Sequence, residues 1–82
     1  MDSVSARIME KLWQRTLPTD EPVKTRGDYG SGLPCDGCDV AITSTEPEHE
    51  VEMADARTLR FHVACDGLWR VLKATRPGPG RS

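Results

Sequence analysis

Two short pairs of metal-ligand residues constrain the fold of this chain more than any other feature of its sequence. Cys35 and Cys38 are separated by two residues, as are His62 and Cys65, and twenty-three residues lie between the pairs. In a tight turn, or on one face of a helix, two side chains three positions apart converge on one point. The spacing therefore predicts that Cys35, Cys38, His62 and Cys65 form the tetrahedral site of one structural zinc ion.

The length of the chain explains why a metal would matter. A chain of 82 residues forms one small domain with a thin core, and many such domains depend on a metal or a disulfide. Its three cysteines are an odd number, which argues against a closed disulfide framework. No apolar run is long enough for a signal peptide or a membrane span. We therefore expect a cytoplasmic protein without membrane attachment, in which paired cysteines bind metal.

The first part of the chain is predicted to be an amphipathic helix over residues 1–17. Val4, Ile8 and Leu12 recur at helical spacing and form its apolar stripe. Pro18 is expected to end it, because the residue before a proline is pushed out of the helical region.

Three further segments follow this helix in the predicted α+β fold. Residues 18–33 are rich in proline and glycine, which predicts an irregular linker packed on or near the core. Residues 34–75 are expected to form a zinc-binding module made of a zinc knuckle, a β-hairpin and a C-terminal helix. Residues 76–82 are predicted to be a disordered tail.

Within the module, the knuckle is expected around the cysteine pair, with Gly37 at a positive backbone dihedral angle and a short strand over residues 40–42. Alternating segments at residues 48–53 and 58–62 predict the hairpin. Apolar residues at helical spacing predict the helix over residues 63–74.

The first hairpin strand presents two different faces. His49, Val51 and Met53 are predicted to face the core with Phe61 and Trp69. The other face carries a row of glutamates, which we expect to be a solvated edge rather than a set of catalytic carboxylates: Glu46, Glu48, Glu50 and Glu52.

The ligand spacing resembles the first zinc-binding half of a LIM domain, and the order of elements resembles a treble-clef zinc finger. The resemblance covers roughly residues 33–74 and includes Phe61 and Trp69 beside the four ligands. It implies the metal site and the local fold. A full LIM domain has a second set of four ligands after the first, and this sequence has none after Cys65, so no partner specificity carries over.

A second likeness rests on Arg60, Phe61 and His62 followed by Cys65 and Trp69. This combination is similar to short bacterial zinc-binding proteins of unassigned role. It implies no activity.

Two alternatives concern individual ligands. Cys35 and Cys38 are also spaced like a redox pair, but such pairs sit in a thioredoxin-like sheet that needs a longer chain. His49 is a second candidate nitrogen ligand, although a hydrogen-bonded histidine on the sheet is the simpler interpretation. Four protein ligands leave no open coordination position, so we expect no enzyme activity.

The expected function is a structural zinc domain that serves as a protein-interaction or regulatory module with a protein partner. One alternative is a nucleic-acid-binding regulator, which the net charge of −2 does not favour. That alternative rests on six basic residues near the two helices: Arg7, Lys11, Arg15, Arg70, Lys73 and Arg76. The simpler interpretation of the first three is a solvated helix face. Another alternative is a redox or metal sensor in which oxidation releases zinc. The oligomeric state has no signal in the sequence.

Overall fold

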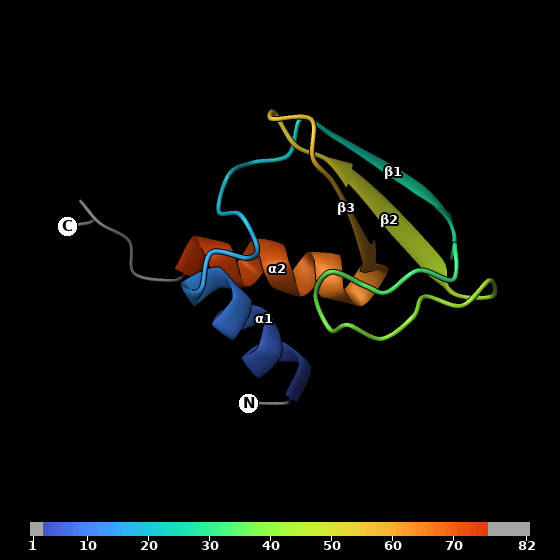
Figure 1. Ribbon diagram of the computed structural model, residues 1–82, viewed down its shortest axis with the longest axis horizontal. Helices are drawn as coiled ribbons and strands as arrows, with labels where there is room; N and C mark the ends of the chain where they lie inside the picture. Colours follow the sequence, from blue (N-terminus) through green and yellow to red (C-terminus); the bar gives the residue numbers. More distant parts are fainter. Residues whose placement is uncertain (1–2, 76–82) are drawn as a thin grey trace.

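A computed structural model describes residues 3–75 of the chain. Five elements follow one another along the chain (Figure 1): helix α1 (Ser3–Trp13), strands β1 (Lys24–Tyr29), β2 (Pro47–Glu52) and β3 (Thr58–His62), and helix α2 (Val63–Thr75). They confirm the α+β class. The first two residues of the predicted helix and the predicted tail at 76–82 lie outside the described residues. No helix in the described part is both long and apolar enough to cross a bilayer.

The predicted hairpin is confirmed by strands β2 and β3. They pair antiparallel with His49 opposite Phe61 and Val51 opposite Leu59. Between the strands the chain reverses in a tight turn, where Ala56 has a φ of 74°. Helix α2 follows β3 directly and packs across the sheet (Figure 1).

The core lies between the sheet and the two helices. Trp69 of α2 is fully buried and stacks on Phe61 of β3 with ring centroids 5.1 Å apart, a contact that adds about 1 kcal/mol beyond its burial. Its indole N–H donates to the carbonyl of Pro18 at 2.9 Å. Val51 and Met53 are buried beside this pair, as the alternation predicts.

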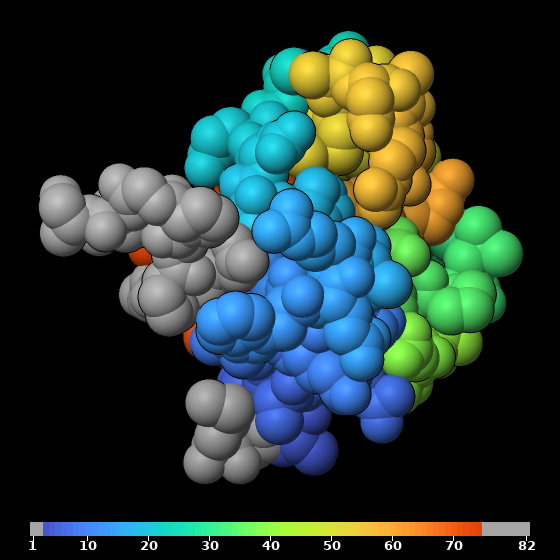
Figure 2. Space-filling view, turned by 60° about the vertical axis from the view of Figure 1, so that its left-hand side comes forward, coloured from blue at the N-terminus to red at the C-terminus, as the bar shows by residue number. Residues whose placement is uncertain are grey.

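Helix α1 completes the core with its predicted apolar stripe. Ile8 and Leu12 are fully buried and Val4 packs against them, whereas Trp13 is 56% exposed. Figure 2 shows α1 and the segment after it covering the middle of one face of the molecule. The helix therefore docks through Ile8 and Leu12.

The end of α1 differs from the prediction. The helix stops at Trp13 rather than near Leu17. The N–H of Thr16 donates to the carbonyl of Lys11, the N–H of Arg15 donates to that of Leu12, and Arg15 has a φ of 63°. This is a Schellman motif. The helix therefore ends in its own capping turn, and Pro18 is not what terminates it.

The prediction of an irregular linker over residues 18–33 is wrong for Lys24–Tyr29, which form β1. Every residue of β1 is exposed, so the strand carries no hydrophobic alternation. Its backbone pairs antiparallel with β2, from Lys24 opposite Glu52 to Tyr29 opposite Pro47. The pairing alone makes this segment a strand.

β1 also changes the environment of the glutamate row. The sheet order is β1-β2-β3, so β2 is the central strand and the predicted solvated edge is wrong. Glu48 is only 4% exposed; it accepts hydrogen bonds from the N–H and hydroxyl of Ser31 and from Arg60. Burial opposes ionisation of Glu48, but these hydrogen bonds prevail and lower its pKa.

Gly30, directly after β1, sits where no side chain fits. A Cβ atom there would lie 1.9 Å from the carbonyl oxygen of Thr43. Gly67 in α2 is a matched control, because a Cβ atom there would meet nothing within 4 Å.

We expect Gly30→Ala to lower the free energy of unfolding by about 3 kcal/mol, since overpacking against backbone cannot relax through a side chain. Gly67→Ala is expected to raise it by about 0.5 kcal/mol through helix propensity. Urea denaturation of both variants beside the wild type measures the two changes. Equal stability of the two variants would contradict the packing described at Gly30.

Candidate metal centre

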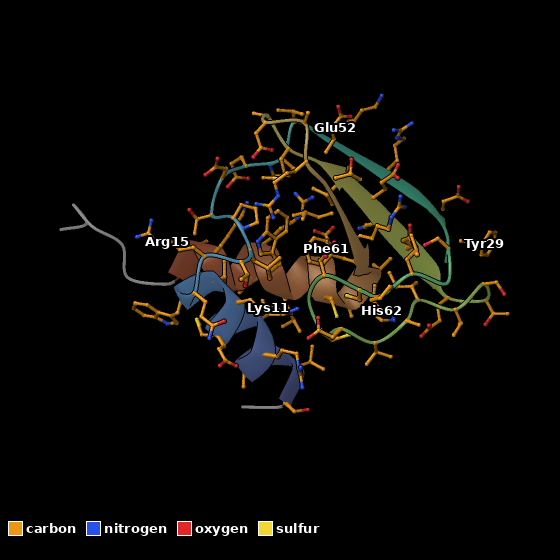
Figure 3. The ribbon with its side chains drawn as sticks, viewed as in Figure 1. Lys11, Arg15, Tyr29, Glu52, Phe61 and His62 are labelled. Atoms are coloured by element: carbon orange, nitrogen blue, oxygen red, sulfur yellow. The ribbon has the colours of Figure 1, made fainter. Side chains whose placement is uncertain are left out.

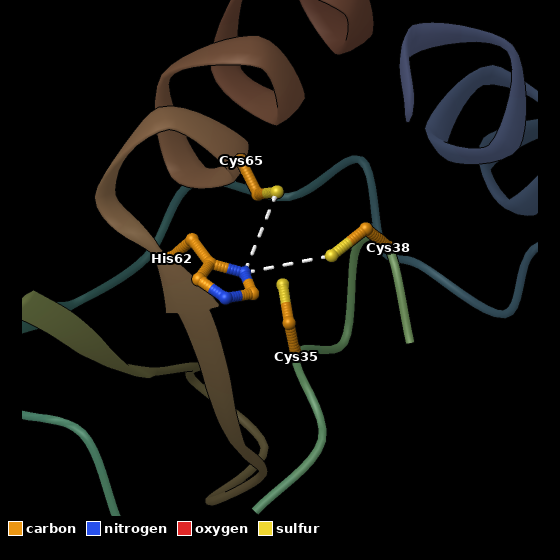
Figure 4. Close-up of side chains that lie close together, drawn as sticks. All are labelled: Cys35, Cys38, His62 and Cys65. Carbon is orange, nitrogen blue, oxygen red and sulfur yellow. Dashed lines mark hydrogen bonds between the residues drawn. The ribbon is translucent and has the colours of Figure 1, made fainter. Parts of the chain in front are cut away.

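The four predicted ligand residues come together at one point of the fold. Their ligand atoms all lie within 4.8 Å of one another. Nδ1 of His62 is 3.5 Å from Sγ of Cys38 and 3.9 Å from Sγ of Cys65 (Figure 4). Ligand atoms around a tetrahedral zinc ion are about 3.5–3.8 Å apart, given zinc–sulfur and zinc–nitrogen bonds of about 2.3 and 2.0 Å. The cluster can therefore hold one metal ion.

The first ligand pair lies in a knuckle formed by residues 34–41. Pro34 and Ala41 form a single β-bridge that closes it, and the predicted strand over residues 40–42 is reduced to that bridge. The N–H of Cys35 donates to the carbonyl of Val40, and the N–H of Asp39 donates back to the carbonyl of Cys35. These bonds hold both sulfurs on the inner side of the turn.

Gly37 has a different role from the one predicted. The positive φ in the knuckle belongs to Asp39, at 69°, and not to Gly37. A Cβ atom on Gly37 would lie 3.2 Å from Cβ of Cys65 and 3.3 Å from Cδ1 of Ile8. A side chain here would crowd both neighbours, because α1 and α2 approach the backbone of the knuckle closely.

The second ligand pair lies at the junction of β3 and α2. His62 is the last residue of β3 and Cys65 is in the first turn of α2. Alternation along β3 buries Phe61 in the core and turns His62 to the opposite face of the sheet (Figure 3). Because no loop separates the two elements, both ligand side chains are fixed by regular backbone.

The two ring nitrogens of His62 have separate environments. Nδ1 faces the sulfurs, whereas Nε2 lies 3.5 Å from Oε1 of Glu46. The N–H and hydroxyl of Thr43 donate to the same carboxylate and lower the pKa of Glu46, and the nearby His62 ring lowers it further. A carboxylate on the remote nitrogen fixes the tautomer with Nδ1 free to bind a metal. Sequence reasoning missed this role of Glu46, because no spacing rule connects it to His62.

The electrostatics of the cluster favour a cation. Burial raises the pKa of the Cys65 thiol, and the adjacent Cys35 and Cys38 raise it further. Three thiolates so close together repel one another, and a divalent cation offsets that repulsion directly.

Helix α1 contacts the knuckle through its basic side chains. Arg7 pairs with Asp39 at 3.0 Å, and Lys11 pairs with Asp39 at 2.5 Å and donates to the carbonyl of Asp36 at 2.9 Å. The hydrogen bond from Lys11 lowers the pKa of Asp39 against the opposing effect of burial, and Arg7 adds to the lowering. The predicted solvated face is therefore wrong for Lys11, whose side chain is 20% exposed, whereas Arg7 remains 54% exposed.

His49 lies outside the metal cluster. Its Nδ1 is 2.6 Å from Oδ2 of the buried Asp66, whose other oxygen accepts from Arg70 at 2.8 Å. The interpretation of His49 as a hydrogen-bonded histidine on the sheet is confirmed.

Comparison of the chain with protein-family models, curated proteins and solved structures finds no significant match. Its function must therefore be inferred from its own residues.

The contact between Glu46 and His62 can be tested by metal affinity. We expect Glu46→Gln to weaken metal binding about tenfold, because the uncharged amide stabilises the bound imidazole less than a carboxylate does. Glu52→Gln is the control, since Glu52 is the last residue of β2, at the end of the strand remote from Glu46, and is not one of the cluster residues. Competition with a chromophoric chelator at fixed pH measures both constants, and equal constants would exclude a role for Glu46.

Proposed function

We propose that the chain binds one zinc ion through Cys35, Cys38, Nδ1 of His62 and Cys65, and that this zinc is structural. The convergence of the four ligand atoms within 4.8 Å is the observation that carries the proposal. Three sulfurs and one imidazole nitrogen are typical ligands of structural zinc, whereas magnesium and calcium prefer oxygen.

The surroundings of the cluster support a structural role. The knuckle joins β3 through two hydrogen bonds of 2.7 Å, in which Asp36 donates its N–H to the carbonyl of Arg60 and accepts the N–H of Arg60 at Oδ2. It also meets α1 at Ile8 and α2 at Cys65. A zinc ion here would cross-link a loop, a strand end and a helix start.

We further propose that the module is of the treble-clef type and resembles the first zinc-binding half of a LIM domain. The order of knuckle, β2–β3 hairpin and α2 supports this assignment. Four protein ligands would fill a tetrahedral zinc ion, so a catalytic role for the metal has no support.

We infer that the domain serves as a protein-interaction or regulatory module of the reducing cytoplasm, where its ligand thiols stay reduced. Support comes from large apolar side chains that remain outside the core. Those exposed by more than half are Trp13, Val23, Tyr29, Val40 and Val71.

The ion pairs of the basic residues argue against the nucleic-acid alternative. Arg7 and Lys11 pair with Asp39, Arg70 with Asp66, and Lys73 with Glu21. Arg76 lies outside the described residues. Phosphate binding would have to compete with these existing partners, which favours a protein ligand. A sensor role would use the same cluster, where Cys38 is the least buried thiol.

Metal removal tests the structural role. Native mass spectrometry of the purified protein should show one zinc ion per chain. Chelation is expected to collapse the dispersion of the amide NMR spectrum for residues 34–75, and added zinc should restore it, because a structural zinc site folds only when its ligands are joined. A dispersed spectrum after complete metal removal would overturn the proposal. Iron in the mass spectrum would show that the bound metal is iron and not zinc.

Ligand substitution gives an independent measurement. We expect Cys38→Ser to weaken zinc binding about a hundredfold, since about 12 kcal/mol shared among four ligands is about 3 kcal/mol each. Ser44→Ala, at an exposed position in the loop after the knuckle, is the control and should bind zinc like the wild type. If Cys38→Ser bound zinc as tightly as the wild type, Cys38 would not be a zinc ligand.

A further inference from the structure

The described part of the sheet has one open edge. On the outer edge of β3, the central residue Arg60 already pairs with the knuckle through its two hydrogen bonds with Asp36. β1, at the opposite edge (Figure 1), is exposed along all six residues and contains no proline. Such an edge is a template for another strand.

The ladder fixes which backbone groups of β1 point outward. The N–H of Gly30 donates to the carbonyl of Glu46, so the alternate residues before Gly30 also bond to β2, and the backbone groups of Thr25, Gly27 and Tyr29 face away from it. The N–H of Tyr29 is taken by Oδ1 of Asp28 at 2.7 Å. The outward backbone groups of Thr25 and Gly27 have no hydrogen-bond partner within the described residues.

The charges of β1 are complementary to a second copy of the same strand. If Gly27 pairs with Gly27 of an antiparallel copy, Arg26 lies opposite Asp28 of that copy, and the symmetry creates this pair twice. These would be non-hydrogen-bonded positions, where opposing side chains are closest. Centring the pairing on Arg26 or on Asp28 instead places like charges opposite each other, so the charges select one register.

The other face of β1 fits the same register. Gly27 leaves a gap beside His49, whose Cδ2 is 3.9 Å from the position of a Cβ atom on Gly27. Tyr29 is 73% exposed and projects from the body of the molecule (Figure 3). In the register centred on Gly27, Tyr29 of the second copy lies opposite Thr25 and diagonal to Gly27, where its ring can cover the gap.

We propose that β1 is a homodimer interface, in which two copies of the chain pair antiparallel about Gly27 and extend the sheet across both. The Arg26–Asp28 ion pairs set the register, and each would extend the exposed ion pair that Arg26 already makes with Glu50 at 3.5 Å. The pairing involves one strand of six residues from each copy, which is a small contact, so the dimer is reversible. The proposal is independent of the identity of the bound metal.

Sedimentation of the zinc-loaded 82-residue chain over a range of concentrations tests the pairing. The wild type should shift from 9.1 kDa towards about twice that mass as its concentration rises to about 1 mM. Arg26→Asp and Asp28→Arg each place like charges at both pairs, so each variant alone should dimerise at least about tenfold more weakly. An equimolar mixture should recover the wild-type affinity, because the carboxylates of one variant then face the guanidinium groups of the other at both pairs.

Lys24→Glu is the matched control. It changes the charge of the same strand by the same amount as Arg26→Asp but lies opposite Gly30 in the proposed register, so it should dimerise like the wild type. Far-UV circular dichroism and zinc content establish that each variant is folded. A wild type that stays monomeric at about 1 mM overturns the proposal. Pairing of β1 with a strand of another protein would not support it, because the proposed partner is a second copy of this chain. A mixture that fails to recover dimerisation overturns it too.

Discussion

The structure depends on the contact between the cysteine knuckle and the junction of β3 with α2. This contact joins residues far apart in the chain: the backbone of Asp36 pairs with that of Arg60, and the sulfurs of the knuckle face His62 and Cys65. Closing a loop of this length costs conformational entropy. The hydrogen bonds and the apolar contact at Gly37 offset part of that cost, and a bound metal would offset the remainder.

The parts of the fold that follow from local periodicity could be predicted from the sequence. The hairpin and α2 have clear alternation and clear helical spacing, and their buried residues Val51, Phe61 and Trp69 are those predicted. The convergence of the four candidate ligand residues could be predicted for a similar reason, since their spacing reflects a geometric requirement of one ion rather than the global fold.

The features that depend on tertiary contacts could not be predicted. β1 has no buried face, and its pairing with β2 is absent from its own sequence pattern. The burial of Glu48 follows from that pairing, because Ser31 reaches it only when β1 lies alongside. Gly37 was expected to adopt a positive backbone dihedral angle, yet its distinctive feature is the close approach of Ile8 and Cys65 from two helices.

The docking of α1 connects the metal centre to the remainder of the core. Exposed ion pairs such as Arg7–Asp39 contribute at most about 1 kcal/mol, whereas complete burial of Ile8 contributes about 2 kcal/mol. Burial of Ile8 in the core therefore contributes more to the docking of α1 than the exposed ion pair does, and the basic side chains orient the helix on the knuckle. A zinc ion with three thiolates carries a net charge of about −1. Lys11 bonds to the backbone of the same turn, so a bound metal would strengthen the attraction between α1 and the knuckle. Metal binding and helix docking would in this way be coupled through one short turn.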